Sequence, residues 1–162
     1  MKKGFTLAEV LITLGIIGVV AALTIPTLSV STKQESFNAM HKVCTSDLEN
    51  AFTTMMASEG AADLNETVAF SENKIIDNLT KYIKISKDSS DSNKCIMKNG
   101  AVVTFSDAKD LVNLEGETIK AEDMVQEIYI DINGNEKPNA KDIDQFRYAL
   151  LDTGLLERVK FD

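Results

Sequence analysis

The sequence predicts an α+β fold in which a long N-terminal helix is packed on a small antiparallel β-sheet domain. Three observations predict it: an uncharged apolar run near the N-terminus, a stripe of apolar residues at helical spacing after it, and short apolar segments separated by turn residues in the second half. The 162 residues leave about 130 for one soluble domain once the apolar run is set aside, which suits a single core.

The apolar run comes first in the chain. From Val10 to Thr32, 23 consecutive residues carry no charge. As a helix, this run is long enough to cross the roughly 30 Å hydrocarbon core of a membrane. A secretory signal peptide would have an apolar centre of only about 7 to 15 residues. Lys2 and Lys3 precede the run, so we expect a single-pass protein with a cytoplasmic N-terminus and an exported C-terminal domain.

Glu9 is the lone carboxylate beside this run. A carboxylate within an apolar helix costs at least a few kcal/mol at mid-membrane, so it is usually present for a specific partner. If the chain is cut after Gly4, the new amino terminus at Phe5 carries a positive charge one helical turn from Glu9. That charge could also come from a neighbouring subunit. The alternative is an ordinary signal anchor with Glu9 at the cytoplasmic interface.

The segment Gly4-Phe5-Thr6-Leu7-Ala8-Glu9, after two basic residues, resembles the class III signal of type IV pilins and type II secretion pseudopilins. The resemblance implies a pilin-like fold and cleavage between Gly4 and Phe5 by a membrane-bound prepilin peptidase, which also N-methylates Phe5. It implies that Glu9 guides assembly and that Pro26 kinks the helix. The implied partners are that peptidase, other pilin or pseudopilin subunits, an inner-membrane assembly platform, and membrane lipid before assembly.

The chain divides into four expected segments. Residues 1–4 form the leader, 5–32 a transmembrane or filament-core helix, 33–58 its amphipathic continuation, and 59–162 a globular α+β domain. Apolar residues recur every three or four positions along the continuation, so one face of it should pack on the domain: Phe37, Met40, Cys44, Leu48, Ala51, Phe52 and Met55. Gly60 is expected to end the helix.

The globular domain should begin with a shorter helix capped by Ser71, with apolar residues on one side at Ile75, Ile76, Leu79, Tyr82 and Ile83. Asn99-Gly100 predicts a two-residue hairpin turn in which both residues have positive φ. It would join strands at Lys94–Lys98 and Ala101–Ser106. Further strands are expected at Glu127–Ile132, Ile143–Leu151 and Leu155–Phe161, with a turn at Asp152-Thr153-Gly154. Residues 106–123 are ambiguous.

Cys44 and Cys95 are the only cysteines. Both would lie outside the cytoplasm, where a disulfide can persist, so we expect a bridge from the long helix to the first strand. By closing a loop of about 50 residues it would stabilise the fold by a few kcal/mol. The alternative is two small buried thiols.

Oxygen-bearing side chains follow one another closely from the end of the third predicted strand onward: Asp131, Asn133, Asn135, Asp142 and Asp144. Alternating oxygen ligands around a tight glycine-containing loop suit Ca²⁺. The pattern departs from an EF-hand, because glycine stands at the fourth position and no glutamate stands at the twelfth. Some pseudopilins have a similar calcium loop near the carboxyl end. The alternative is a polar turn between strands.

An enzyme is not expected. Asp152-Thr153-Gly154 resembles the active-site tripeptide of aspartic proteases, but those need two carboxylates that share a proton, and no second copy of the motif occurs. A turn between strands explains the same residues. His41 is the only histidine, which excludes a histidine-rich metal site, and we expect it to be a solvated side chain.

The formal charge of −8 argues against a nucleic-acid partner, because an acidic surface repels phosphates. Two classes of function remain. The first is a structural subunit of a type II secretion pseudopilus or a type IV pilus, including a competence or minor pilin. The second is a membrane-anchored binding domain that does not assemble. The calcium pattern and the small acidic domain favour secretion slightly.

Overall fold

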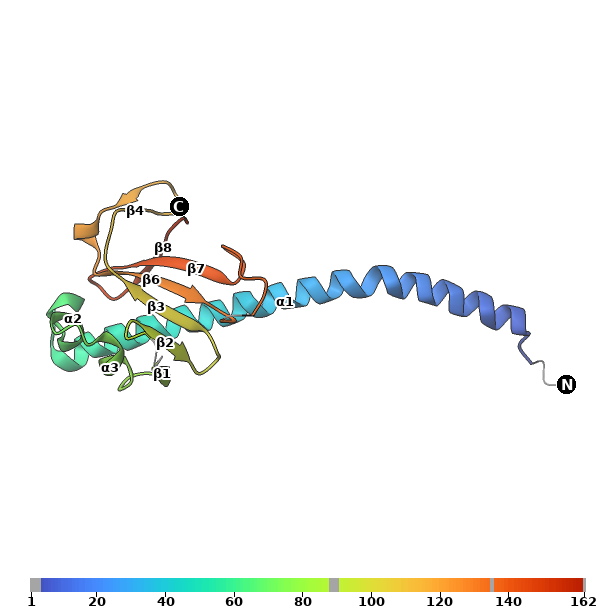
Figure 1. The fold of residues 1–162 in the computed structure, drawn as a ribbon, viewed down its shortest axis with the longest axis horizontal. Helices are drawn as coiled ribbons and strands as arrows, with labels where there is room; N and C mark the ends of the chain where they lie inside the picture. Colours follow the sequence, from blue (N-terminus) through green and yellow to red (C-terminus); the bar gives the residue numbers. More distant parts are fainter. Residues whose placement is uncertain (1–3, 88–90, 135, 162) are drawn as a thin grey trace. The chain divides into compact units, whose positions relative to one another are not determined.

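The computed structural model describes residues 4–87, 91–134 and 136–161, with the backbone alone for residues 26–31. These residues fall into two compact units, divided between Ser36 and Phe37. The helix α1 (Leu7–Glu59) begins in the first unit and ends in the second. The long predicted helix is therefore confirmed, and it passes through Pro26 without an interruption of the helical assignment (Figure 1).

The helix α1 ends where the glycine predicted it. Gly60 has a φ of +66°, a left-handed conformation that glycine adopts without strain. The amide of Ala61 donates to the carbonyl of Met56 at 3.1 Å, which is the long hydrogen bond of a Schellman cap. A 3₁₀ turn, Leu64–Glu66, follows, with the side chain of Asp63 accepting from two of its amides.

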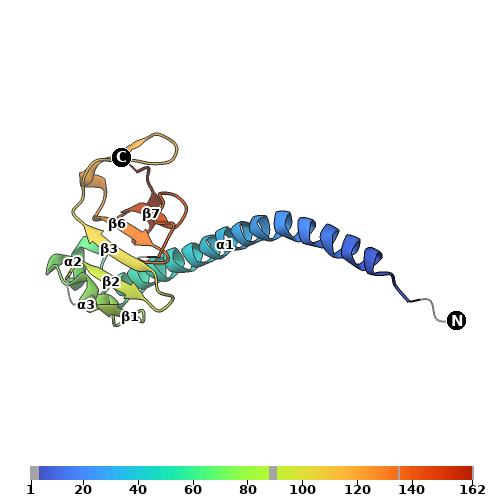
Figure 2. The same cartoon turned by 45° about the vertical axis from the view of Figure 1, so that its right-hand side comes forward.

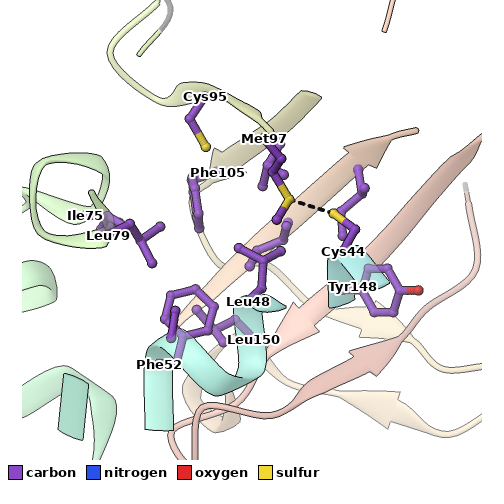
Figure 3. Packing of buried hydrophobic residues seen from close by; sticks show 14 of the residues in the cluster. Cys44, Leu48, Phe52, Ile75, Leu79, Cys95, Met97, Phe105, Tyr148 and Leu150 are labelled. Carbon is purple, nitrogen blue, oxygen red and sulfur yellow. Dashed lines mark hydrogen bonds between the residues drawn. The ribbon is translucent and has the colours of Figure 1, made fainter. Parts of the chain in front are cut away.

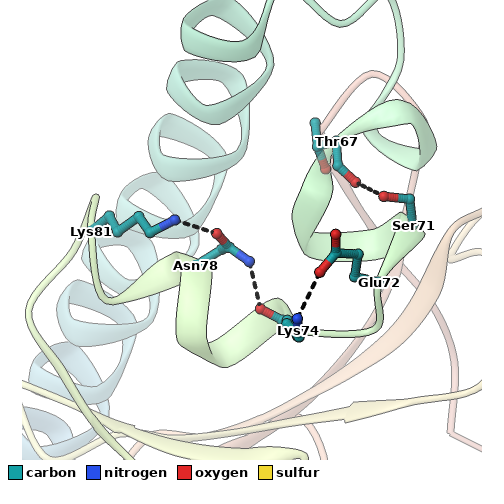
Figure 4. Close-up of polar contacts among 6 residues, drawn as sticks. All are labelled: Thr67, Ser71, Glu72, Lys74, Asn78 and Lys81. Carbon is teal, nitrogen blue, oxygen red and sulfur yellow. Dashed lines mark hydrogen bonds and ion pairs between the residues drawn. The ribbon is translucent and has the colours of Figure 1, made fainter.

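The shorter predicted helix is present as α3 (Ile75–Leu79), with Ile75, Ile76 and Leu79 buried, but it is shorter than expected and its predicted cap at Ser71 is wrong. A helix that was not predicted, α2 (Val68–Ser71), precedes it. Asn73 has a φ of +53° and stops α2 with a second Schellman cap, in which the amide of Lys74 donates to the carbonyl of Ala69 at 2.7 Å. Ser71 therefore ends a helix instead of capping one. Its hydroxyl donates to the carbonyl of Thr67 (Figure 4).

The main sheet has six antiparallel strands in the order β1-β2-β3-β6-β7-β8. Their bounds are β1 Ile85–Lys87, β2 Lys94–Met97, β3 Val102–Ser106, β6 Gln126–Asp131, β7 Gln145–Leu150 and β8 Leu156–Arg158. The five predicted strands are present: β2, β3 and β7 are shorter by one to three residues, β6 is shifted by one residue, and β8 has three of the seven predicted residues. The edge strand β1 was not predicted, because its three residues show no alternation of apolar and polar side chains.

Residues 37–59 of α1 lie along one face of this sheet (Figures 1 and 2). The predicted apolar stripe makes the contact: Cys44, Leu48, Ala51, Phe52 and Met55 are buried, and Phe37 and Met40 pack at the edge of the cluster. Alternate strand residues, among them Met97, Phe105, Tyr148 and Leu150, fill the other side of the core (Figure 3).

Three hairpins use the same loop. In each, three residues lie between the last two residues that are hydrogen-bonded across the hairpin, and the third is a glycine with positive φ: Gly100 at +90°, Gly116 at +95° and Gly154 at +82°. The glycine amide closes a tight turn by donating three residues back, at 2.9 to 3.2 Å. This is a turn followed by a left-handed residue, so the two-residue turn predicted at Asn99-Gly100 is wrong. Asn99 is not one of the described non-glycine residues with a positive φ.

The ambiguous segment 106–123 forms a small hairpin of its own. It consists of β4 (Leu111–Val112) and β5 (Thr118–Ile119), followed by a 3₁₀ turn, Ala121–Asp123. Leu111 and Ile119 form a second apolar cluster with Met124, Ala149 and Val159, on the side of the sheet away from α1. This pairing is short, so local periodicity could not reveal it.

Candidate functional site

The N-terminal segment is the first candidate site. Gly4, Phe5 and Thr6 precede the helix without regular secondary structure, and the Phe5 side chain is 89% exposed. No described atom lies within 4 Å of a Cβ placed on Gly4. The peptide bond between Gly4 and Phe5 is therefore accessible to a protease, with the helix beginning two residues after Phe5.

Glu9 has a partner within the chain, which the sequence analysis missed. Its Oε2 accepts from the amide of Thr6 and from the Thr6 hydroxyl, both at 2.8 Å. The amide of Glu9 donates to the Thr6 hydroxyl at 3.3 Å. This reciprocal pair is a capping box, which satisfies donors at the start of α1. The Thr-x-x-Glu spacing is its sequence signature and could have predicted it.

Leu7–Ile25 is long and apolar enough to cross a membrane, and it is the one such helix among the described residues. None of this span is buried. Its large apolar side chains therefore expose a continuous surface, and exposed apolar surface of this extent marks contact with lipid or with other proteins. The side chain of Pro26 lies outside the described residues, so the kink stays a prediction.

Two of the predicted calcium ligands have partners within the protein. Asp144 is buried and accepts from the amides of Asn139 and Ala140, at 2.7 and 2.6 Å. Asp142 forms an ion pair with Arg158 at 2.9 Å. Asp144 thus stabilises the turn at Asn139 and Ala140, and Asp142 holds the side chain of Arg158.

The other predicted ligands do not add support for the site. Asp131 Oδ1 and Asn133 Oδ1 are buried without a hydrogen bond, and Asn135 lies outside the described residues. Across the described chain, no group of three or more Asp, Glu, His or Cys side chains could hold a metal ion. Calcium is therefore unsupported, and the loop stays a prediction.

The predicted disulfide is absent, and Cys44 and Cys95 are both free, buried thiols. The Sγ atom of Cys44 lies 2.8 Å from Sδ of Met97 (Figure 3). Met97 is two residues beyond Cys95 on the same strand, about 7 Å further along. Burial, together with neighbouring Cys95 and Asp47, raises the pKa of Cys44 to about 12, and burial raises the pKa of Cys95 to about 12. Neither thiol is a nucleophile at neutral pH.

The Asp152-Thr153-Gly154 turn has a structural role. Gly154 is buried against α1, where an added Cβ would lie 3.2 Å from the Cβ of Phe52. The carbonyl of Asp152 accepts from the amide of Leu64 at 2.8 Å. The turn therefore holds the β7–β8 hairpin against the long helix. This agrees with the interpretation of these residues as a turn between strands.

The prediction that His41 is solvated is wrong. Its ring is half-buried and stacks on Phe146, with ring centroids 3.9 Å apart. Its Nε2 contacts the hydroxyl of Tyr148. Burial and, secondarily, the charge of Arg158 lower the pKa of His41. A lone helical histidine carries no local signal for this contact, because Phe146 and Tyr148 lie more than 100 residues further along the chain.

Comparison with known families identifies the N-terminal segment. Residues 1–25 match the prokaryotic N-terminal methylation motif, the prepilin-type signal typical of type IV pilins and pseudopilins. The motif implies a pilin or pseudopilin that is processed by prepilin peptidase and assembles with pilins, and it suggests a structural, non-enzymatic protein. No curated protein and no solved structure matches the chain.

Proposed function

We propose that this chain is a structural subunit of a type II secretion pseudopilus or a type IV pilus. Prepilin peptidase cleaves it between Gly4 and Phe5 and methylates the new amino group of Phe5, and the subunit then assembles through α1. The match of residues 1–25 to the methylation motif is the observation that carries this proposal. The accessible Gly4–Phe5 bond and the unburied apolar span support it.

The apolar surface of Leu7–Ile25 is covered first by lipid and later by neighbouring subunits. Before assembly, Leu7–Ile25 lies in the inner membrane, with the N-terminus in the cytoplasm. The second compact unit, which begins at Phe37 and is called the sheet unit below, is exported. During assembly, the apolar side chains exchange lipid for the helices of neighbouring subunits on an inner-membrane platform. Dispersion contacts between helices replace those with lipid, so the exchange needs little change in apolar burial.

Glu9 is the charged group that takes part in this exchange. In the uncleaved chain its carboxylate is held by Thr6. Cleavage creates an ammonium group on Phe5, and we assign the charge of Glu9 to pairing with that group on an adjacent subunit. The pairing compensates for placing a carboxylate in an apolar filament core, which would otherwise cost several kcal/mol.

The secretion system and the pilus remain alternatives, as does a role as a competence or minor pilin. The preference for secretion depended partly on the calcium loop, for which the described residues give no support. A membrane-anchored binding domain that does not assemble is the second class of function. It predicts an uncleaved protein that stays evenly distributed in the membrane.

A two-part experiment tests the proposal. The chain is expressed with a prepilin peptidase, and its N-terminus is read by mass spectrometry. A mature N-terminus at methylated Phe5 is expected, and one at Met1 would contradict the assignment.

Filament assembly is then compared for wild type, Glu9→Gln and Glu9→Ala. Glutamine keeps the capping-box geometry but removes the charge. Both variants should be cleaved yet form at least about tenfold fewer filaments, since one lost ion pair of 1.4 kcal/mol already gives that factor. Normal assembly of Glu9→Gln would refute the charge pairing, while leaving the cleavage result intact.

A further inference from the structure

A groove lies on the face of the main sheet opposite α1. The strand register places two rows of side chains across its floor, because aligned residues on neighbouring strands point to the same face. Lys94, Thr104, Tyr129 and Arg147 form the first row, and Ile96, Val102, Asp131 and Gln145 form the second. With strands about 4.8 Å apart, a row of four spans about 14 Å.

All of these residues except Ile96 line one cavity of about 490 Å³, within the usual range for small-ligand sites. The last described residue, Phe161, forms one wall, with its ring centroid 6.4 Å from that of Tyr129. The ammonium group of Lys141 lies 5.3 Å from the centroid of the Phe161 ring. The groove therefore combines two aromatic rings with positive charge.

Arg147 holds the groove in shape. It is buried in an ion pair with Glu127, and its Nη1 donates to the carbonyl of Lys160 at 3.1 Å. This bond ties the C-terminal residues to the sheet and positions Phe161. Because Glu127 compensates Arg147, we assign the charge that faces a ligand to Lys94. This charge lies on a chain whose formal charge is −8.

Acceptor groups complete the groove. Asp131 Oδ2 accepts from the side-chain amide of Gln145 at 3.2 Å, and Asp131 Oδ1 is buried without a hydrogen bond. Burial raises the pKa of Asp131, although Gln145 and the nearby amides of Asn133 and Gly134 oppose the shift. A ligand hydroxyl could donate to Asp131 Oδ2, because a carboxylate oxygen has two lone pairs and the Gln145 amide uses one of them.

The chemistry of the floor selects among ligand classes. The backbone groups of β2, β3, β6 and β7 are already paired within the sheet, so this face offers a peptide main chain no ladder to join. It offers only aromatic rings, ammonium groups and side-chain oxygens. A sugar ring presents an apolar face for aromatic rings and a rim of hydroxyls for such oxygens. Lys94 adds a preference for a carboxylate, and the acidic protein disfavours a polyanion.

We propose that this groove binds a short saccharide bearing a single carboxylate. The sugar ring lies against Tyr129 and Phe161, a hydroxyl donates to Asp131 Oδ2, and the carboxylate faces Lys94. This inference is independent of filament assembly, because every residue that carries it lies in the sheet unit.

Isothermal titration of the full-length protein tests the proposal. The detergent must have a polyoxyethylene head group, because a maltoside would compete. Three probes are compared: cellobiouronic acid, its neutral analogue cellobiose, and triglutamate as an acidic peptide. Cellobiouronic acid should bind about fivefold more tightly than cellobiose, the effect of one partly exposed ion pair. Triglutamate should not bind.

Groove variants then locate the binding. Lys94→Ala should remove the preference for the uronate, and Phe161→Ala should weaken both sugars about fivefold, the value of one aromatic contact. Lys98→Ala is the matched control, since it removes the same charge from the exposed hairpin outside the groove. Thr104→Arg should block the floor and abolish binding, and circular dichroism would show whether each variant is folded.

Three results would overturn the proposal. The first is no heat with either sugar at 10 mM probe, a concentration of about 10 times a millimolar dissociation constant. The second is binding that folded Thr104→Arg leaves unchanged. The third is triglutamate binding as tightly as the uronate, which would make the groove a general anion surface.

Discussion

The two ends of one helix differ in what surrounds their apolar side chains. In the first unit, Leu14 of α1 is 60% exposed, and in the second unit Leu48 of the same helix is fully buried. Both parts are regular α-helix. Helix formation therefore does not depend on burial here. The first part carries an apolar surface that only lipid or another subunit can cover, whereas the second part covers its surface with its own sheet.

The largest expected effect separates these two parts directly. Leu48→Ala should lower the free energy of unfolding by about 2 to 5 kcal/mol, because it removes packed methyl groups from the core. Leu14→Ala changes the same residue type on the same helix and should alter it by no more than about 0.5 kcal/mol. Chemical denaturation of the full chain in detergent measures both. Equal losses would show that the two parts form one cooperative core.

The contact between the β7–β8 hairpin and α1 can be disrupted at Gly154. An added Cβ would lie 3.2 Å from the Cβ of Phe52, and the residue has a φ of +82°. Gly100→Ala is the control, because its φ is +90° and no atom lies within 4 Å of the added Cβ. Gly154→Ala should cost about 1 to 3 kcal/mol more than the control, which is the penalty for overpacking. Equal melting temperatures would mean that the helix moves to accommodate the methyl group.

At the other end of α1, the Thr6–Glu9 capping box can be tested without assembly. Thr6→Ala should destabilise the first turn by about 0.5 to 2 kcal/mol, since the cap hydroxyl is lost. Hydrogen exchange at the amides of residues 7–10 should accelerate accordingly, while core amides of β6 stay protected. Thr13→Ala is the control, because its hydroxyl bonds to the carbonyl of Val10 inside the helix. Unchanged exchange in Thr6→Ala would show that the box does not hold the helix start.

The smallest expected effect is a pH dependence at the contact between His41 and β7. Because the pKa of His41 is lowered in the folded protein, the folded state binds fewer protons than the unfolded state as the pH falls through about 6.5. The stability that His41 contributes is thus fully present above that pH and is lost on acidification, down to its folded pKa. The melting temperature should fall between pH 8 and pH 5 more steeply in wild type than in His41→Gln. Parallel curves would contradict this.

Much of the helix could be predicted, because its information is local. The stripe from Cys44 to Met55, the stop at Gly60 and the apolar span each depend on residues a few positions apart. The predicted cap at Ser71 is wrong for an equally local reason: Asn73 adopts a left-handed conformation that ends α2 before α3 begins. The Thr6–Glu9 box also has a local signature, the Thr-x-x-Glu spacing.

At the predicted sites in the sheet unit, the side chains have partners that were not predicted, because those partners come from distant strands. Asp142 and Asp144 have the spacing of metal ligands, yet Arg158 and two backbone amides hold them. Cys44 faces Met97 instead of Cys95. Spacing along the chain shows which groups are available, but competing partners across the fold determine what they do.

The sequence by itself therefore determined the N-terminal signal, the apolar span and the face of α1 that is buried, since periodicity and short motifs act within a few turns of the chain. Only the tertiary structure decided how the acids, the thiols and His41 are used, and which side chains form the groove. Those outcomes depend on strand register, which brings together residues that no local pattern connects.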